Sequence, residues 1–322
     1  MVAEVDAMRA IAIEEFGGPG KLHAMDLPEP KPGRGEVLVR VVAAGVNPVD
    51  WKIREGWLRT FLPHAFPLVP GWDVAGTVED FGEGVARFRK GDRVWAYARK
   101  PVVQWGAYAE WIALPEEIVA KMPSKLLFEE AAAVPLAALT ALQCLRREPA
   151  LGPGKTALVL AAAGGVGHFA VQLARNAGAR VLAVAGPRNQ EFVLGLGAEA
   201  AIDYAREDWS DAADRLCPEG VDFVLDALGG EDQRKAFDIL KPGGRIVGIV
   251  GEPDEELARK REVAADYVFV EPSAEGLDFL GAEVDAGRLR PEVTKVFPLA
   301  DAHEAQKLSQ AGHVRGKLVL AP

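Results

Sequence analysis

Residues that bind metals or form disulfides are scarce in this sequence. The chain of 322 residues contains two cysteines, Cys144 and Cys217, and five histidines. The cysteines lie far apart without a Cys-x-x-Cys spacing, which excludes a disulfide framework and a four-thiolate zinc site. The histidines form no cluster. This composition is typical of a protein that works in the reducing cytoplasm.

Basic runs and export signals are also absent from the sequence. A formal net charge of -10 would repel the phosphate backbone of a nucleic acid. Residues 1–6 are acidic where a signal peptide is basic and then apolar. The uncharged stretch 156–174 contains a glycine-rich turn at 164–167, which indicates a strand joined to a helix and not a membrane span. We therefore expect a cytoplasmic protein that binds neither nucleic acid nor membrane.

The first third of the chain has the composition of a β domain. A length of 322 residues, with 49% hydrophobic and 26% charged residues, favours two globular domains. Runs rich in Val, Trp and Tyr alternate with Gly and Pro, which predicts strands at 36–46, 73–81, 92–98 and 106–114. Helical signal is sparse there and is confined to residues 48–56.

The middle of the chain changes to a pattern of strands and helices. An Ala- and Leu-rich helical stretch runs to residue 147 with an interruption at Pro135, because proline removes an intrahelical donor. Helices then separate apolar strands at 156–162, 181–186, 200–204, 221–228, 245–250 and 266–270. Apolar strands separated by helices predict a doubly wound parallel sheet covered on both faces.

The domain boundaries follow from these changes. We predict an α/β protein in which residues 124–270 form the doubly wound sheet domain. Residues 1–123 and 271–322 together form the β domain, because the last extended run, 317–320, can return to complete its sheet.

The turn after the first strand of the predicted parallel sheet carries a candidate dinucleotide site. Ala163, Gly164, Gly165, Val166 and Gly167 lead directly into a helix. Small residues let the backbone approach a pyrophosphate, and the amino terminus of a helix favours its negative charge. The pattern is less specific than Gly-x-Gly-x-x-Gly, and a tight turn without a ligand is the alternative. The βα units that follow favour the dinucleotide.

The second strand of this sheet ends without the Asp or Glu that holds the ribose hydroxyls in NAD sites. Arg188 follows the strand instead, and its guanidinium can pair with the 2′-phosphate of NADPH, as can the hydroxyl of Tyr204. An ordinary solvated arginine is the alternative. Further coenzyme contacts are expected where the next two strands end, at Ala227, Leu228, Gly229, Val250 and Gly251.

Six segments together resemble the medium-chain dehydrogenase/reductase superfamily, and within it the zinc-free quinone oxidoreductase branch that includes zeta-crystallin. These segments are 45–50 (Gly-Val-Asn-Pro-Val-Asp), 70–76, 91–94, 106–110, 161–167 and 316–320. The resemblance covers nearly the whole chain. It implies a GroES-like mostly-β domain, a Rossmann domain and a homodimer. It also places Thr140, which resembles a threonine near the nicotinamide ring, and Lys317, in the last segment, at the coenzyme.

The zinc alcohol dehydrogenases of this superfamily bind catalytic zinc with a cysteine and a histidine from the first two segments. This sequence has Asn47 and Trp72 at those positions, and neither an amide nor an indole is a zinc ligand. We therefore expect no metal. Asn47 is the predicted catalytic residue, as a hydrogen-bond donor to the substrate oxygen, although a turn residue before Pro48 is the alternative. Asp73 is interpreted as a structural ion-pair partner.

Several side chains of the β domain are candidates for the wall of a substrate pocket. The apolar candidates are Trp51, Trp57, Leu58 and Trp105, and His64 is a further candidate. Core packing is the alternative for the aromatic residues.

The combined hypothesis is an NADPH-dependent, metal-independent oxidoreductase. A quinone or an α,β-unsaturated carbonyl compound suits a site without a Lewis acid, because conjugation spreads the negative charge that hydride transfer leaves. Two alternatives stay open: an enoyl-thioester reductase and an NADPH-binding protein without turnover.

Overall fold

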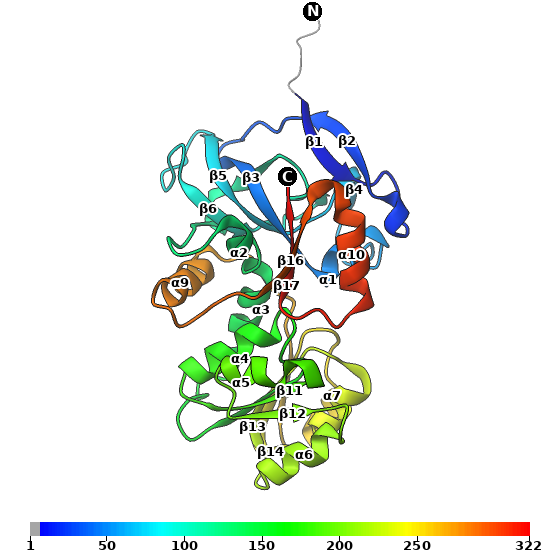
Figure 1. Ribbon diagram of the computed structural model, residues 1–322, viewed down its shortest axis with the longest axis vertical. Helices are drawn as coiled ribbons and strands as arrows, with labels where there is room; N and C mark the ends of the chain where they lie inside the picture. The colour runs from blue at the N-terminus through cyan, green and yellow to red at the C-terminus, as the bar shows by residue number, and fades with distance from the viewer. Residues whose placement is uncertain (1–6) are drawn as a thin grey trace, which may run out of the picture. The chain divides into compact units, whose positions relative to one another are not determined.

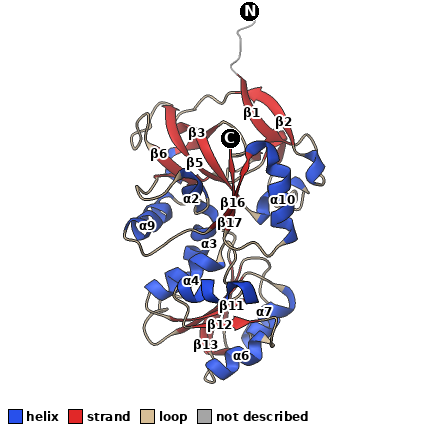
Figure 2. Cartoon of the chain, in the orientation of Figure 1, coloured by secondary structure: helices blue, strands red, loops and turns tan. Residues whose placement is uncertain are grey.

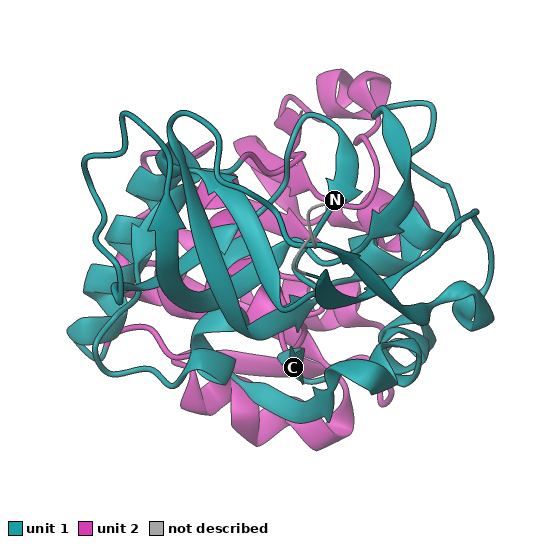
Figure 3. Cartoon of the chain, turned by 90° about the horizontal axis from the view of Figure 1, so that it is seen from above, with its two compact units in different colours: residues 1–136, 272–287, 291–322 teal, residues 137–271, 288–290 magenta. Residues whose placement is uncertain are grey.

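The computed structural model describes residues 7–322 and shows two compact units (Figures 1 and 2). Residues 1–6, whose acidic character argued against a signal peptide, lie outside the described residues. The first unit comprises the residues up to 136 together with 272–287 and 291–322, and the second comprises 137–271 and 288–290 (Figure 3). In the described part of the chain, no helix is both long and apolar enough to span a bilayer.

A seven-stranded sheet forms the centre of the first unit. Its strands, in spatial order, are β16 (Val293–Pro298), β17 (Lys317–Ala321), β3 (Glu36–Val46), β5 (Asp73–Phe81), β6 (Arg93–Tyr97) and β9 (Val119–Lys121), and β8 (Trp111–Pro115) also pairs with β3. Two further pairs are β1 (Ala7–Ala12) with β2 (His23–Pro28), and β4 (His64–Val69) with β7 (Val103–Trp105). The helices are α1 (Pro48–Arg54), α2 (Phe128–Ala132), α9 (Ala274–Asp285) and α10 (Ala302–Ala311), with short 3₁₀ turns η1 (Pro19–Lys21), η2 (Glu116–Ile118) and η4 (Leu299–Asp301).

The end of the chain completes this sheet, as the sequence predicts. Strand β17 pairs antiparallel with β3, with Leu318 opposite Val46, and parallel with β16. This pairing brings Lys317 next to the residue at which β3 ends. Strands β3 and β5 approach so closely that a Cβ at Gly76 would lie 2.1 Å from the carbonyl oxygen of Arg40.

A six-stranded parallel sheet forms the second unit. The strands, in spatial order, are β12 (Ala200–Asp203), β11 (Arg180–Ala185), β10 (Thr156–Val159), β13 (Val221–Asp226), β14 (Leu240–Gly248) and β15 (Ala264–Tyr267). The helices are α3 (Pro135–Leu145), α4 (Gly167–Asn176), α5 (Gln190–Gly195), α6 (Trp209–Leu216), α7 (Gly230–Ala236) and α8 (Glu255–Lys260), with the 3₁₀ turn η3 (Pro187–Asn189). The first strand, β10, lies inside the sheet between β11 and β13, which is the doubly wound order. The predicted α/β class, with a GroES-like domain and a Rossmann domain, is confirmed.

Some bounds differ from the sequence prediction. Residues 124–136 group with the first unit, whereas the predicted boundary is at 123, because α2 packs against β3 and β5. Residues 271 and 288–290, which the sequence assigns to the β domain, group with the second unit. The predicted strand at 106–114 starts later, as β8 at Trp111, and residues 106–110 form the loop between β7 and β8. At the start of this loop the backbone of Gly106 lies so close to Pro70 that a Cβ would be 2.3 Å from the Pro70 carbonyl oxygen.

Candidate functional site

The turn between β10 and α4 brings backbone amides to one edge of the parallel sheet. Ala161 adopts a left-handed conformation with φ of 50° and turns the chain sharply. A Cβ on Gly167 would lie 2.3 Å from the carbonyl oxygen of Ala161, so only glycine permits this approach. Of the side chains in residues 7–322, none caps the amino terminus of α4. The predicted residues Ala163–Val166 form this turn, whose amide groups and helix dipole fit an anionic pyrophosphate.

A cavity of about 600 Å³ lies where β11 and β12 end. Its lining residues are mostly polar: Pro187, Arg188, Gln190, Glu191, Ala201, Asp203, Arg206 and Glu207. The exposed Arg188 thus lies in a cavity, as a ligand-binding arginine requires. Asp203 already has a partner, because Arg206 Nε lies 3.3 Å from its carboxylate. The hydroxyl of Tyr204 lies over Gly186 at the same edge, 3.0 Å from the position of a Cβ on that glycine.

The loops after β13 and β14 meet beside this edge. The buried carboxylate of Asp226 accepts hydrogen bonds of 2.9 Å from the backbone of Leu228 and of Gly229. Gln233 connects the two loops, because its amide donates to Asp226 at 2.8 Å and to the carbonyl of Gly251 at 3.2 Å.

The other predicted residues of this coenzyme edge lie in the same unit. Ala227 and Val250 lie in these two loops, and the Val250 side chain would be 3.6 Å from a Cβ on Gly229. Thr140 is buried on α3.

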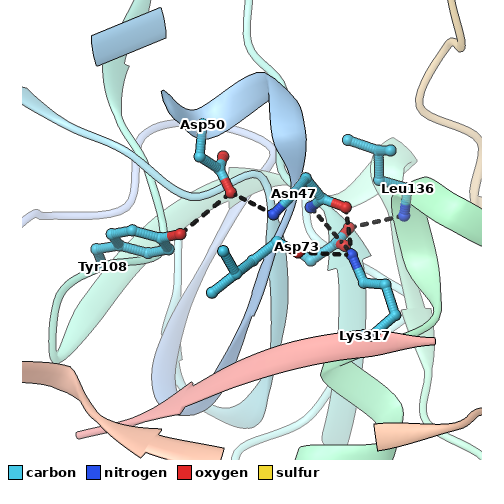
Figure 4. A network of polar contacts seen from close by, with 7 residues as sticks. Asn47, Asp50, Asp73, Tyr108, Leu136 and Lys317 are labelled. Carbon is cyan, nitrogen blue, oxygen red and sulfur yellow. Dashed lines mark hydrogen bonds and ion pairs between the residues drawn. The ribbon is translucent and has the colours of Figure 1, made fainter. Parts of the chain in front are cut away.

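Asn47 lies at the junction of β3 and α1 and is almost completely buried, with 1% exposure. The carboxylate of Asp50 accepts its backbone N–H at 2.7 Å. Its side-chain nitrogen donates to Asp73 at 2.9 Å, and its side-chain oxygen accepts a hydrogen bond from Lys317 (Figure 4). An amide nitrogen carries two hydrogens, and Asp73 accepts one of them. Together with the hydrogen bond from Lys317 to the amide oxygen, this contact fixes the orientation of the amide.

Lys317 is the buried cation of this network. Its ammonium donates to Asn47 and, at 3.0 Å, to the carbonyl of Val46, and it lies 3.5 Å from the carboxylate of Asp73. Burial lowers the pKa of Lys317 and raises the pKa of Asp73, while their ion pair acts in the opposite direction on both. Asp73 also accepts the backbone N–H of Leu136 at 2.7 Å. The predicted structural ion pair of Asp73 is thus present, and the role of Lys317 at the coenzyme stays a prediction.

A second buried carboxylate, Asp50, completes the network. Its Oδ2 accepts hydrogen bonds from Asn47 and, at 3.1 Å, from the hydroxyl of Tyr108 (Figure 4). Its Oδ1 has no partner within residues 7–322. Burial raises the pKa of Asp50 to about 7, and the hydrogen bond from the Asn47 backbone counteracts part of this rise. The carboxyl group therefore gains or loses a proton near neutral pH.

Trp72, at the other position of a zinc ligand, belongs to the core. It is 4% exposed and its ring packs against Tyr97 with the centroids 5.9 Å apart. Across residues 7–322, no three His, Cys, Asp or Glu side chains gather in a group that could hold a metal ion.

The predicted pocket residues all lie in the first unit, on α1 and the segments that follow it. The rings of Trp51 and Trp57 meet edge to face with centroids 5.1 Å apart, and Trp57 is 57% exposed. Leu58 follows in the same turn and is partly buried. His64 starts β4, and Trp105 ends the paired strand β7 with 39% exposure. Trp57 and Trp105 are thus partly exposed, and their role in a substrate pocket stays a prediction.

Sequence reasoning missed the side chains that hold these groups in place. Asp50 stands three residues after Asn47, the spacing with which a side chain returns to the first N–H of a helix, and this signal could have identified it. Asp226 and Gln233 carried no comparable signal, and neither did Lys52, whose ammonium lies over the indoles of Trp51 and Trp57.

Two family models match the chain. An alcohol dehydrogenase GroES-like domain model matches residues 33–124, and a zinc-binding dehydrogenase model matches residues 196–320. A chloroplast envelope quinone oxidoreductase homolog from Arabidopsis thaliana is 36% identical over 331 residues, 98% of each chain. An NADPH-dependent alkenal/one oxidoreductase from the same plant is 33% identical over 324 residues, which cover 98% of this chain and 80% of the relative.

Solved structures agree with these matches. A quinone oxidoreductase from Coxiella burnetii is 35% identical and superimposes with a TM-score of 0.89 over 98% of this chain and 100% of its own. The relatives and the solved structure extend over nearly the whole length and share both units. The chain therefore belongs to the quinone oxidoreductase branch of the medium-chain dehydrogenase/reductase superfamily, a group of oxidoreductases that use a nicotinamide coenzyme.

Proposed function

We propose that this enzyme uses NADPH, without a metal, to reduce quinones or α,β-unsaturated carbonyl compounds. The observation that carries the proposal is the fixed amide of Asn47, which has one hydrogen left to donate at the position where zinc relatives place a metal ligand. Relatives named quinone oxidoreductase and NADPH-dependent alkenal/one oxidoreductase support this substrate class. We also propose that the enzyme is a cytoplasmic homodimer, as the sequence resemblance implies.

The edge of the parallel sheet supplies the groups that would hold NADPH. The close approach at Gly167 and the uncapped start of α4 suit the pyrophosphate, and Arg188 in its cavity suits the 2′-phosphate. When bound, the coenzyme supplies the hydride. The remaining task of the protein is to orient the acceptor and to stabilise the charge that develops on it.

Asn47 would stabilise this charge through its second amide hydrogen. The orientation of the amide is set before substrate binds, because Asp73 takes one hydrogen and Lys317 occupies the oxygen. A donor that needs no reorientation stabilises developing charge more effectively than water does. Because quinone or enone reduction leaves a delocalised phenolate or enolate, a hydrogen-bond donor can replace a Lewis acid.

The proposed function predicts saturable NADPH oxidation when a quinone or an alkenone is added to the purified protein. Chelators should leave the rate unchanged, because Asn47 and Trp72 replace the zinc ligands. Absorbance of NADPH measured with and without EDTA tests both points. Tight NADPH binding without turnover of any quinone, alkenal or enoyl thioester would contradict the proposal, and so would one essential zinc per chain in elemental analysis.

Replacing Asn47 should lower turnover more than binding. We expect Asn47→Ala to reduce kcat by up to about 10²-fold, as loss of one oxyanion donor does, with little change in NADPH affinity. The variant should also melt at a lower temperature, because Lys317 and Asp73 each lose a buried partner. Rates are therefore measured below the melting transition. Leu318→Ala, a buried neighbour on β17, is the control for destabilisation, and an equal fall of kcat in both variants would remove the catalytic role of Asn47.

Arg188 should set the preference between the two coenzymes. Loss of a charge-assisted contact costs about 1.5–3 kcal/mol, so Arg188→Ala should bind NADPH roughly one to two decades more weakly while NADH changes little. Fluorescence titration with both coenzymes measures this. Arg261→Ala, which removes an exposed arginine of the same unit paired with Asp238, is the control. Equal losses for NADPH and NADH would show that Arg188 supports the fold instead.

Protonation of Asp50 should make stability depend on pH. The pKa of Asp50 in the folded protein, about 7, lies above its ordinary value of 3.8, so the folded state keeps a proton that the unfolded chain releases. The free energy of unfolding therefore falls as the pH rises from about 4 to 7, by on the order of 4 kcal/mol from this group. Denaturant unfolding of Asp50→Asn at pH 5 and pH 8 should lack this contribution. The exposed Asp80→Asn is the control, and identical pH profiles for wild type and Asp50→Asn would contradict the assignment.

A further inference from the structure

Helix α1 and the turn behind it place the ammonium of a lysine over two neighbouring indole rings. The ammonium of Lys52 lies 5.6 Å from the ring centroid of Trp51 and 5.9 Å from that of Trp57. The two rings contact each other edge to face at 82°. The Lys52 side chain is partly buried, and this burial lowers the pKa of its ammonium. Aromatic faces attract a cation, but they carry no net charge that could neutralise it.

Within residues 7–322, Lys52 has no carboxylate at ion-pair distance and no hydrogen-bond acceptor. The two acidic residues nearest to it in sequence have other partners. Asp50 accepts hydrogen bonds from the Asn47 backbone and from Tyr108, and Glu55 pairs with Arg54 at 2.7 Å and accepts from Gln310 at 2.9 Å.

The side-chain polar atoms of Lys52, Trp51 and Trp57 are one ammonium and two indole nitrogens, and all three are hydrogen-bond donors. The indole nitrogen of Trp51 is buried and has no acceptor in the described chain. A partly desolvated cation without an anion is costly unless a ligand supplies the acceptor. The chain has a net charge of -10 and therefore repels anions in general. The positive charge of Lys52 would attract an anion locally in spite of this repulsion.

We propose that Lys52, framed by Trp51 and Trp57, binds a carboxylate group of the substrate, so that the enzyme favours conjugated carbonyl compounds with an acidic group and an apolar body. The indoles supply the apolar contact: Trp57 is 57% exposed and Phe61, in the same segment, is 81% exposed. This inference rests on the proposed function, because it names the class of quinone or enone that the site accepts. The carboxylate takes no part in hydride transfer and serves as an anchor.

Binding of a matched acid and ester tests the proposal without any turnover. Calorimetric titration in saturating NADP⁺ uses β-benzoylpropionate, a saturated keto acid with an aromatic ring, and its methyl ester, which lacks the charge. Wild type should bind the acid more tightly than the ester. Lys52→Gln and Lys52→Met should each weaken acid binding by about tenfold and leave ester binding unchanged, whereas Lys52→Arg should keep most of it. Lys90→Gln, an exposed lysine paired with Asp80, is the control and should change neither ligand.

The outcomes separate the inference from the proposed function. Equal affinity of wild type for acid and ester, or an equal loss of both in Lys52→Gln, overturns the role of Lys52. The rates at which the enzyme reduces β-benzoylacrylate and its methyl ester are a second, independent readout. For the acid, Lys52→Gln should raise KM about tenfold and leave kcat nearly constant. If the wild type binds the acid through Lys52 but reduces neither compound, the proposed function is contradicted, whereas the assignment of Lys52 as an anion-binding residue is supported.

Discussion

The burial of Lys317 beside Asp73 and Asn47 is the constraint on which the first unit depends. A buried ammonium is costly unless it is paired and fully hydrogen-bonded, and the structure gives Lys317 an oxygen of Asn47, the carbonyl of Val46 and the carboxylate of Asp73. Lys317 and Asn47 are 270 residues apart in sequence. The sheet therefore cannot satisfy its buried charges until the last strand, β17, pairs with β3.

This constraint also explains why an amide suits position 47. The residue must accept a hydrogen bond from a lysine on one side and donate one to a carboxylate on the other, and an amide has both an acceptor and a donor. A thiolate offers no donor to Asp73, and an alkyl side chain would remove one hydrogen bond from Asp73 and one from Lys317. The polar network thus requires the two-sided hydrogen bonding of an amide at this position.

Local patterns predicted the fold well, and long-range contacts limited the prediction of the site. The bounds of β3 and β5 are as predicted, because their Val-rich runs end at clear turn residues. The glycines after β10 were recognised because close approach of a backbone requires them, and Gly167 has that approach. Nothing local predicts that Lys317 reaches Asn47, since the contact depends on strand pairing between opposite ends of the chain. That Lys52 has no counter-ion within residues 7–322 is likewise a property of the folded surroundings and not of its neighbours in sequence.

Helix α1 carries buried polar residues beside partly exposed side chains. Asn47, Asp50 and Arg54 recur at helical spacing and are buried, with hydrogen bonds to other parts of the unit. Trp51 and Lys52 come between Asp50 and Arg54 in the sequence and are only partly buried. Their side chains take no part in the hydrogen bonds that Asn47 makes to Asp50, Asp73 and Lys317. Under the proposed function, a substitution at Lys52 would therefore change substrate preference without removing the partners that orient the Asn47 amide.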